Sequence, residues 1–197
     1  MAVAAVKTAK TINVIDIEAS GFGRDSYPIE IGIALADGRQ YQTLVRPEAG
    51  WQHWDRSAQD VHGISRSDLF KYGRSVFQIC REINEICAGA VLYSDCWVYD
   101  HYWFRRLFDA AHTPALGQCK AMEYLLNDEQ QLDYQTVKQT FASRLGLPMH
   151  RALNDAVVIQ KTLQSLTGSY HENAGRMESL QPAIRSSQQT RQGLRIA

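Results

Sequence analysis

Two carboxylates lie two residues apart within the first hydrophobic segment of this 197-residue chain. Asp16 and Glu18 alternate with Ile15 and Ile17, in a segment rich in β-branched residues that begins at residue 11. Side chains alternate between the two faces of a strand, so both carboxylates project to the same side. Neighbouring buried acids repel one another unless a cation lies between them, and their oxygens suit Mg²⁺ or Mn²⁺. The pattern therefore predicts a divalent-cation site, although two acids meeting solvent at a strand end would show the same spacing.

Two further segments carry groups that suit hydrolysis. His150 lies just before the last predicted helix, 151–166, and Asp155 lies about one turn inside it. A histidine with a pKa near its ordinary value of ~6.5 can accept a proton from water at neutral pH. Asp100 stands near the start of another predicted helix, 99–111, where an acid is also a common N-cap. Taken singly, these residues fit helix N-termini as well as they fit a reaction centre.

The elements that position these residues follow from hydrophobic periodicity and turn residues. Strands are predicted at 11–17, 29–35, 41–45 and 90–93, the first three as antiparallel neighbours. After a polar connection, helices are predicted at 75–89, 99–111, 120–126, 132–145 and 151–166. In this order of elements, consecutive strands come first and strands that alternate with helices come after them. The order predicts an α/β fold with a mixed sheet flanked by helices.

Composition predicts one folded domain over residues 1–167, since 45% of the residues are hydrophobic and the length suits a single core. The chain becomes polar from Gly168 onward, so 168–197 is predicted to be a flexible tail. The sequence has no run of ~18 apolar residues, so no membrane span is predicted. It also has no recognisable signal peptide, which favours a cytoplasmic location. The four cysteines form no C-x-x-C pair, so reduced thiols are predicted rather than a zinc site.

The net charge of the chain limits the kinds of nucleic acid that it is expected to bind. Lys and Arg together number 21, as do Asp and Glu, so the formal net charge is zero. Proteins that cover long duplexes are usually basic, because their affinity comes from neutralising phosphates. The chain therefore either binds no nucleic acid or contacts few phosphates, with bound metal ions supplying the positive charge.

In order and in combination, these motifs resemble the DEDDh exonucleases, the DnaQ-like members of the proofreading-exonuclease superfamily with a ribonuclease H-like fold. The matching segments are DIEASG at 16–21, IEIG at 29–32, VHGIS at 61–65, YDHYWF at 99–104 and H-x-A-x-x-D at 150–155. The resemblance extends over residues 11–166. It implies a five-stranded mixed sheet, with three antiparallel strands first and parallel strands after them, flanked by helices.

The resemblance implies a metal-dependent 3′–5′ exonuclease that hydrolyses phosphodiester bonds from the 3′ end of single-stranded DNA or RNA and releases nucleoside 5′-monophosphates. It implies two ions, Mg²⁺ or Mn²⁺, with Asp16 bridging both. Glu18 and Asp155 complete the site that activates water, and Asp100 serves the second ion. His150 takes the proton from the attacking water.

Substrate contacts are expected at a second set of residues: Ala19, Ser20, Gly21, Phe22 and His62. Phe22 is expected to stack on a base, whereas packing of its own loop is the competing role for His62. The chain departs from the family at Cys96, where an Asn usually stands four residues before the motif's Asp. Asp95, one residue earlier, is available in its place.

Two other functions fit the same residues. One is an RNA-specific oligoribonuclease or RNA-trimming enzyme, which a contact to the 2′-hydroxyl would distinguish. The other is a non-catalytic nucleic-acid-binding or protein-binding module on the same fold, which the presence of all five catalytic residue types disfavours. The expected partner is a nucleic-acid 3′ end and not a membrane. The family often forms homodimers, so self-association, or docking of the tail to a polymerase or another protein, is a further hypothesis.

Overall fold

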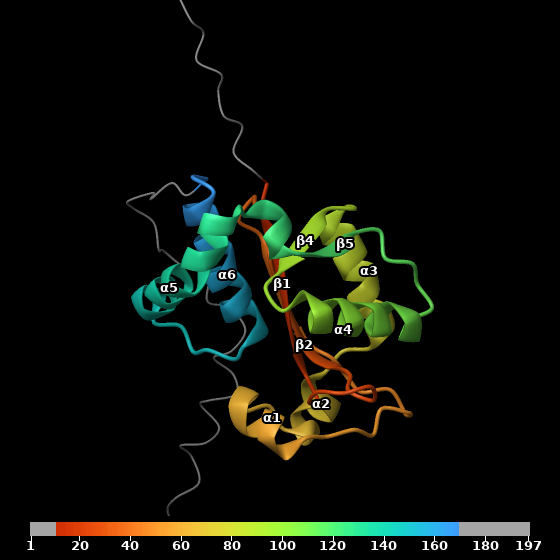
Figure 1. Ribbon diagram of the computed structural model, residues 1–197. Helices are drawn as coiled ribbons and strands as arrows, with labels where there is room; N and C mark the ends of the chain where they lie inside the picture. The colour runs from red at the N-terminus through yellow and green to blue at the C-terminus, as the bar shows by residue number, and fades with distance from the viewer. Residues whose placement is uncertain (1–10, 170–197) are drawn as a thin grey trace, which may run out of the picture.

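A five-stranded mixed sheet lies between two layers of helices in the computed structural model, which describes residues 11–169 (Figure 1). The strand order is β3-β2-β1-β4-β5. The first three strands are antiparallel neighbours: β1 (Asn13–Ala19), β2 (Pro28–Ala34) and β3 (Gln40–Leu44). β4 (Val91–Ser94) and β5 (Gln118–Ala121) continue the sheet in parallel with β1. This arrangement confirms the predicted fold class.

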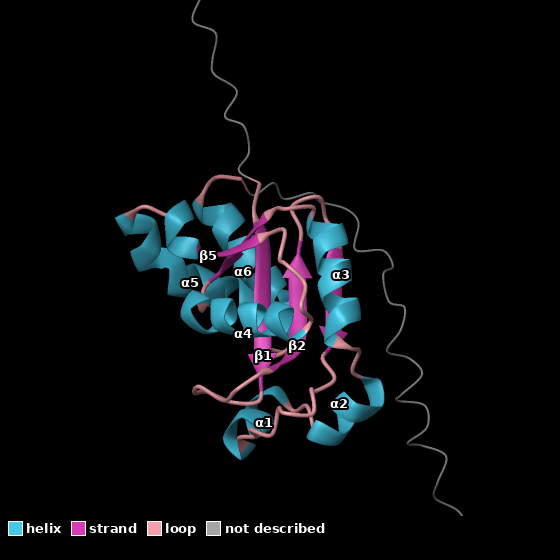
Figure 2. Cartoon of the chain, turned by 90° about the vertical axis from the view of Figure 1, so that its right-hand side faces the viewer, coloured by secondary structure: helices cyan, strands magenta, loops and turns pink. Residues whose placement is uncertain are grey.

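The helices divide between the two faces and one end of the sheet. Their bounds are α1 (Arg56–His62), α2 (Arg66–Tyr72), α3 (Val76–Cys87), α4 (Trp97–Ala110), α5 (Asp128–Leu145) and α6 (Ala152–Leu166). α3 and α4 cover one face and α5 and α6 the other, while α1 and α2 lie beyond one end (Figures 1 and 2). Among the described residues, no helix has the length and apolar character needed to cross a bilayer.

Two segments differ from the sequence prediction. Residues 118–121 form β5 instead of the start of a helix, and only a 3₁₀ turn, η1 (Met122–Leu125), follows them. The prediction of a helix over 120–126 was wrong because the segment QCKA gains its strand structure from parallel pairing with β4, which local residue types do not reveal. α5 also begins earlier than predicted, at Asp128, where the side chain of Asn127 caps it. The predicted flexible tail lies almost wholly outside the described residues, and the boundary at residue 167 stays a prediction.

β1 contributes to a hydrophobic core on each face of the sheet. Ile15 and Ile17 pack with α3 and α4, whereas Val14 packs with α6 on the opposite face. Asp16 and Glu18 follow Val14 on that second face, as strand alternation predicts. One face of β1 is therefore apolar under the body of α6 and acidic where α6 begins.

The N-terminus of α6 is fixed to β2 by close packing and by a partly buried ion pair. A Cβ atom at Gly32 would lie 2.1 Å from the carbonyl carbon of Ala152, so only glycine allows this approach. Two residues earlier, Glu30 is 1% exposed and accepts hydrogen bonds from the guanidinium of Arg151, at 2.6 Å to Oε1, and from the backbone N–H of Ala152 at 3.0 Å. β2 thereby sets the position of the residues that surround the start of α6.

Candidate active site

A pocket of about 450 Å³ opens beside the acidic end of β1. α1, α4, α5 and the segment before α6 complete its walls. Of the ten predicted site residues, eight line it: Asp16, Glu18, Ala19, Gly21, Phe22, His62, His150 and Asp155. Asp100 and Ser20 are buried and do not reach its surface. The sequence motifs, although far apart in the chain, therefore converge on one cavity.

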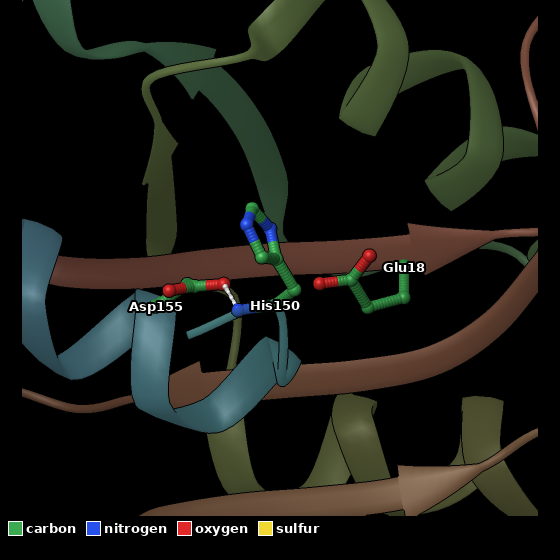
Figure 3. Close-up of side chains that lie close together, drawn as sticks. All are labelled: Glu18, His150 and Asp155. Carbon is green, nitrogen blue, oxygen red and sulfur yellow. Dashed lines mark hydrogen bonds between the residues drawn. The ribbon is translucent and has the colours of Figure 1, made fainter. Parts of the chain in front are cut away.

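Glu18, His150 and Asp155 form a group suited to holding a cation (Figure 3). One ligand atom from each of the three lies within 4.8 Å of the others. Asp155 Oδ2 accepts the backbone N–H of His150 at 2.8 Å, whereas its buried Oδ1 has no hydrogen-bond partner among the described residues. A buried carboxylate oxygen without a partner is unfavourable, so Asp155 favours a positive ligand that would compensate it.

Asp16, which is half-buried, and Asp100, which is buried, add two more acids. Asp100 is 2% exposed, and the hydroxyl of Ser94 donates to its Oδ2 at 2.5 Å. Burial raises the pKa of Asp16 well above its usual range, and the nearby carboxylates of Asp100 and Glu18 raise it further. Burial also raises the pKa of Asp100, although the Ser94 hydrogen bond opposes this effect. Both acids resist ionisation unless a cation compensates their charge.

The pKa values of Glu18 and Asp155 are raised in the same way. Burial, followed by repulsion from Asp155 and Glu30, raises the pKa of Glu18 to about 7. Burial also raises the pKa of Asp155, against the hydrogen bond from the His150 backbone. Oxygen donors with excess negative charge fit Mg²⁺ or Mn²⁺ better than softer metals. The residues present thus fit the predicted divalent ions.

Lys138 of α5 is a member of the site that the sequence prediction missed. It lines the pocket, and its Nζ lies 2.5 Å from Asp95 Oδ2, which also accepts the hydroxyl of Tyr134 at 2.8 Å. Asp95, the predicted substitute for the family's Asn, is therefore tied to α5. Cys96 itself lines the pocket. No sequence signal identifies Lys138, because α5 is polar along most of its length.

The loop after β1 supplies the opposite wall of the pocket. The β1–β2 register shifts between Glu18 and Ala19, a bulge that redirects the chain as it leaves the sheet. Gly21 has φ 132°, and a Cβ there would lie 2.6 Å from the Cβ of Asp55. Phe22 is 63% exposed, with its ring edge-on to Tyr99 at 4.8 Å between centroids. The loop thus presents an aromatic ring to solvent at the mouth of the pocket.

Ser20 and His62 have different surroundings from each other. The hydroxyl of Ser20 accepts the backbone N–H of Tyr27 and bonds with the His53 ring, so it supports the loop and does not face the pocket. His62 Nδ1 accepts the backbone N–H of Ile64 at 3.0 Å, which places the hydrogen of the neutral ring on Nε2. Burial lowers the pKa of His62, which favours this neutral form. Its buried Nε2 has no partner among the described residues and is available as a donor.

Comparisons with known proteins support the fold. No family model matches the chain, and no curated protein matches its sequence. A 3′-exonuclease described as recognising the 3′ end of the histone mRNA stem-loop superposes with a TM-score of 0.56 at 15% identity, over 80% of this chain and 81% of that one. A full-length 3′-exonuclease gives 0.55 at 17% identity, over 80% of this chain and 60% of that one.

E. coli Exonuclease I, in a zinc-bound complex with single-stranded DNA, superposes with a TM-score of 0.60 at 14% identity. The match covers 81% of this chain and 40% of Exonuclease I, so this chain corresponds to less than half of that enzyme. The fold is therefore shared with these exonucleases. The predicted resemblance is thereby confirmed at the level of the fold.

Without metal, the protein is expected to lose stability as pH rises. The pKa of Glu18 is about 7 in the folded protein and 4.5 without its surroundings, so between these values the folded state binds more protons than the unfolded state. Stability therefore falls as pH increases through this range, by about 3 kcal/mol for Glu18 alone. Thermal unfolding in EDTA at pH 5 and pH 8 tests this, with Mg²⁺ expected to raise Tm more at pH 8. Glu18→Gln is the control and should flatten the dependence. An equal Mg²⁺ effect at both pH values would contradict the prediction.

Proposed function

We propose that this protein is a metal-dependent 3′–5′ exonuclease that hydrolyses single-stranded DNA or RNA and releases nucleoside 5′-monophosphates. The observation that carries the proposal is the convergence of Asp16, Glu18, His150 and Asp155 on one pocket, with Asp100 buried behind them. The neighbouring structures support it, since their descriptions name 3′-exonucleases and a complex with single-stranded DNA.

Each residue has a role that follows from its position. Asp16, Glu18, Asp100 and Asp155 would hold two Mg²⁺ or Mn²⁺ ions. When bound, such ions polarise the scissile phosphate and lower the pKa of the attacking water. His150 is exposed at the rim, so its imidazole is free to take the proton from that water. The backbone N–H of His150 holds Asp155, which couples the base to a metal ligand.

The terminal nucleotide would lie between the loop after β1 and α1. Phe22 would stack on a base, and the Nε2 hydrogen of His62, which has no partner among the described residues, would donate to the sugar or phosphate. Ala19 and Gly21 contribute the backbone surface of the same wall. Lys138 adds a positive charge near the acids. Its pKa is raised even though burial acts to lower it, because the carboxylates around it dominate.

The test is hydrolysis of matched DNA and RNA oligomers carrying a 5′ label, with Mg²⁺, with Mn²⁺ and with EDTA. A ladder that shortens from the 3′ end only when metal is present is the expected result. Faster hydrolysis of the RNA would indicate the oligoribonuclease or RNA-trimming alternative. Binding without hydrolysis under every condition would indicate the non-catalytic module. The cytoplasmic location and protein partners, including a homodimer, stay predictions from the sequence.

Replacing His150 by Asn is expected to lower kcat by about 10²- to 10⁴-fold, because the proton acceptor is lost. Asn is chosen because His150 has φ 60°, a left-handed conformation that Asn tolerates. The rise in Tm with Mg²⁺ should remain. His112→Asn is the matched control, since His112 also has a positive φ, 48°, and lies outside the pocket. Equal kcat in the two variants would rule out His150 as the base.

A further inference from the structure

A second hollow lies between α4 and β5 and shares no lining residue with the candidate active site. This hollow, the α4–β5 groove, has a volume of about 790 Å³, within the range of ligand-binding cavities. At the start of α4, two consecutive residues line different cavities, Cys96 the first and Trp97 the second. Consecutive Cα atoms are about 3.8 Å apart, so the two cavities lie near each other at this point of the backbone.

Aromatic side chains dominate the groove. Trp97 and His101 stack one helical turn apart on α4, with 5.2 Å between ring centroids and 29° between planes. Phe104 and Phe108 continue the same side of the helix as a buried floor. Tyr124 of η1 faces the groove with 79% of its surface exposed. Exposed aromatic rings beside a cavity form a platform on which nucleobases stack, whatever their sequence.

Two cations at the groove have no partner among residues 11–169. Arg105 is exposed and Lys120 is half-buried, and neither forms an ion pair or side-chain hydrogen bond with any residue between 11 and 169. Asp109 is the carboxylate among the lining residues. The groove therefore carries a local positive charge on a chain that is neutral overall. Unpaired cations next to stacking surfaces suit a nucleic-acid backbone.

β5 is an edge strand, so a second type of ligand has to be considered: an extended peptide that adds a strand to the sheet. The structure disfavours it. The indole Nε1 of Trp97 donates to the carbonyl of Cys119 at 3.0 Å and so occupies a backbone acceptor in the middle of this four-residue strand. A peptide would have to displace Trp97 before pairing, whereas a base can stack on the indole as it stands.

We propose that the α4–β5 groove binds single-stranded nucleic acid upstream of the 3′ end. This rests on the proposed function in one respect, since it places the 3′ terminal nucleotide in the candidate active site. The strand then leaves past Cys96, crosses the first turn of α4, stacks on Trp97 and Tyr124, and places phosphates at Arg105 and Lys120. The groove therefore increases affinity for longer strands without taking part in hydrolysis.

The test is the double variant Arg105→Ala/Tyr124→Ala, which changes exposed side chains only. Binding is measured by fluorescence polarisation with a 5′-fluorescein 12-nucleotide DNA whose phosphorothioate linkages resist cleavage. We expect Kd to rise about tenfold. The slope of log Kd against log salt should fall by about 0.7, the value for each phosphate that a protein neutralises on a single strand. Hydrolysis of an unlabelled dinucleotide, which is too short to reach the groove, should be unchanged.

The matched control is Tyr72→Ala/Arg81→Ala, which removes an exposed tyrosine and an exposed arginine from α2 and α3. If the groove variant and the wild type bind the 12-mer with equal affinity, the proposal is wrong. The groove would then be a candidate site for a protein partner instead. Loss of dinucleotide hydrolysis in the groove variant would also overturn it. A wild type that hydrolyses neither the dinucleotide nor the cleavable DNA and RNA oligomers, yet binds the 12-mer through the groove, would refute the exonuclease function and support the groove.

Discussion

Asp16→Asn is expected to abolish metal-dependent hydrolysis while making the metal-free protein more stable. Asp16 lies among the carboxylates of Glu18, Asp100 and Asp155 and is itself half-buried. The amide removes a shared metal ligand, so kcat/KM should fall by about 10³-fold or more, equivalent to ~4 kcal/mol of transition-state stabilisation. The same change removes buried repulsion. Stability at pH 8 in EDTA should therefore increase, by about 1–3 kcal/mol.

The two opposite effects make this variant diagnostic. Loss of activity through misfolding would lower Tm, whereas loss of a metal ligand from an acidic cluster should raise it in EDTA and remove most of the Mg²⁺-induced rise. Asp133→Asn is the control, because Asp133 is an exposed acid on α5 and lies outside both cavities. Normal metal-dependent turnover by Asp16→Asn would refute the two-ion assignment.

Gly32→Ala is expected to damage both stability and activity. The added Cβ would lie 2.1 Å from one backbone atom of Ala152 and 2.2 Å from the backbone nitrogen of Leu153, so no side-chain rotation relieves the overlap. Separation of α6 from β2 should lower the free energy of unfolding by about 3 kcal/mol, the upper part of the range for overpacking. It should also move His150 and Asp155 relative to Glu18, and a displacement of ~1 Å can reduce the rate by about 10²-fold.

Chemical denaturation and kcat measured on the same preparations test this prediction. Gly50→Ala is the matched control, because a Cβ at Gly50 meets nothing within 4 Å and the residue has no positive φ. It should change stability by less than about 0.5 kcal/mol. Full activity in Gly32→Ala, with stability lowered as expected, would show that β2 supports α6 without setting the geometry of the site.

The parts of the molecule that local pattern controls were predictable from the sequence. Alternation along β1 placed Asp16 and Glu18 on one face, and Ser75 marked the start of α3, where it caps the helix. β5 was missed because its strand structure depends on β4. The pairing of Glu30 with Arg151 was also missed, yet a signal was present. An acid within an apolar strand requires a partner when the strand is buried, and only the fold shows which residue supplies it.

The carboxylate cluster also imposes an order on assembly of the proposed complex. Before a cation binds, those carboxylates of the pocket that are ionised carry charge of the same sign as a nucleic-acid end, so the strand meets repulsion where it must enter. Cation binding reverses the sign of that interaction. By thermodynamic reciprocity, the factor by which Mg²⁺ tightens strand binding equals the factor by which the strand tightens Mg²⁺ binding. In the proposed complex, metal supply would therefore control engagement with 3′ ends as well as turnover, and a protein deprived of Mg²⁺ would release its substrate uncut.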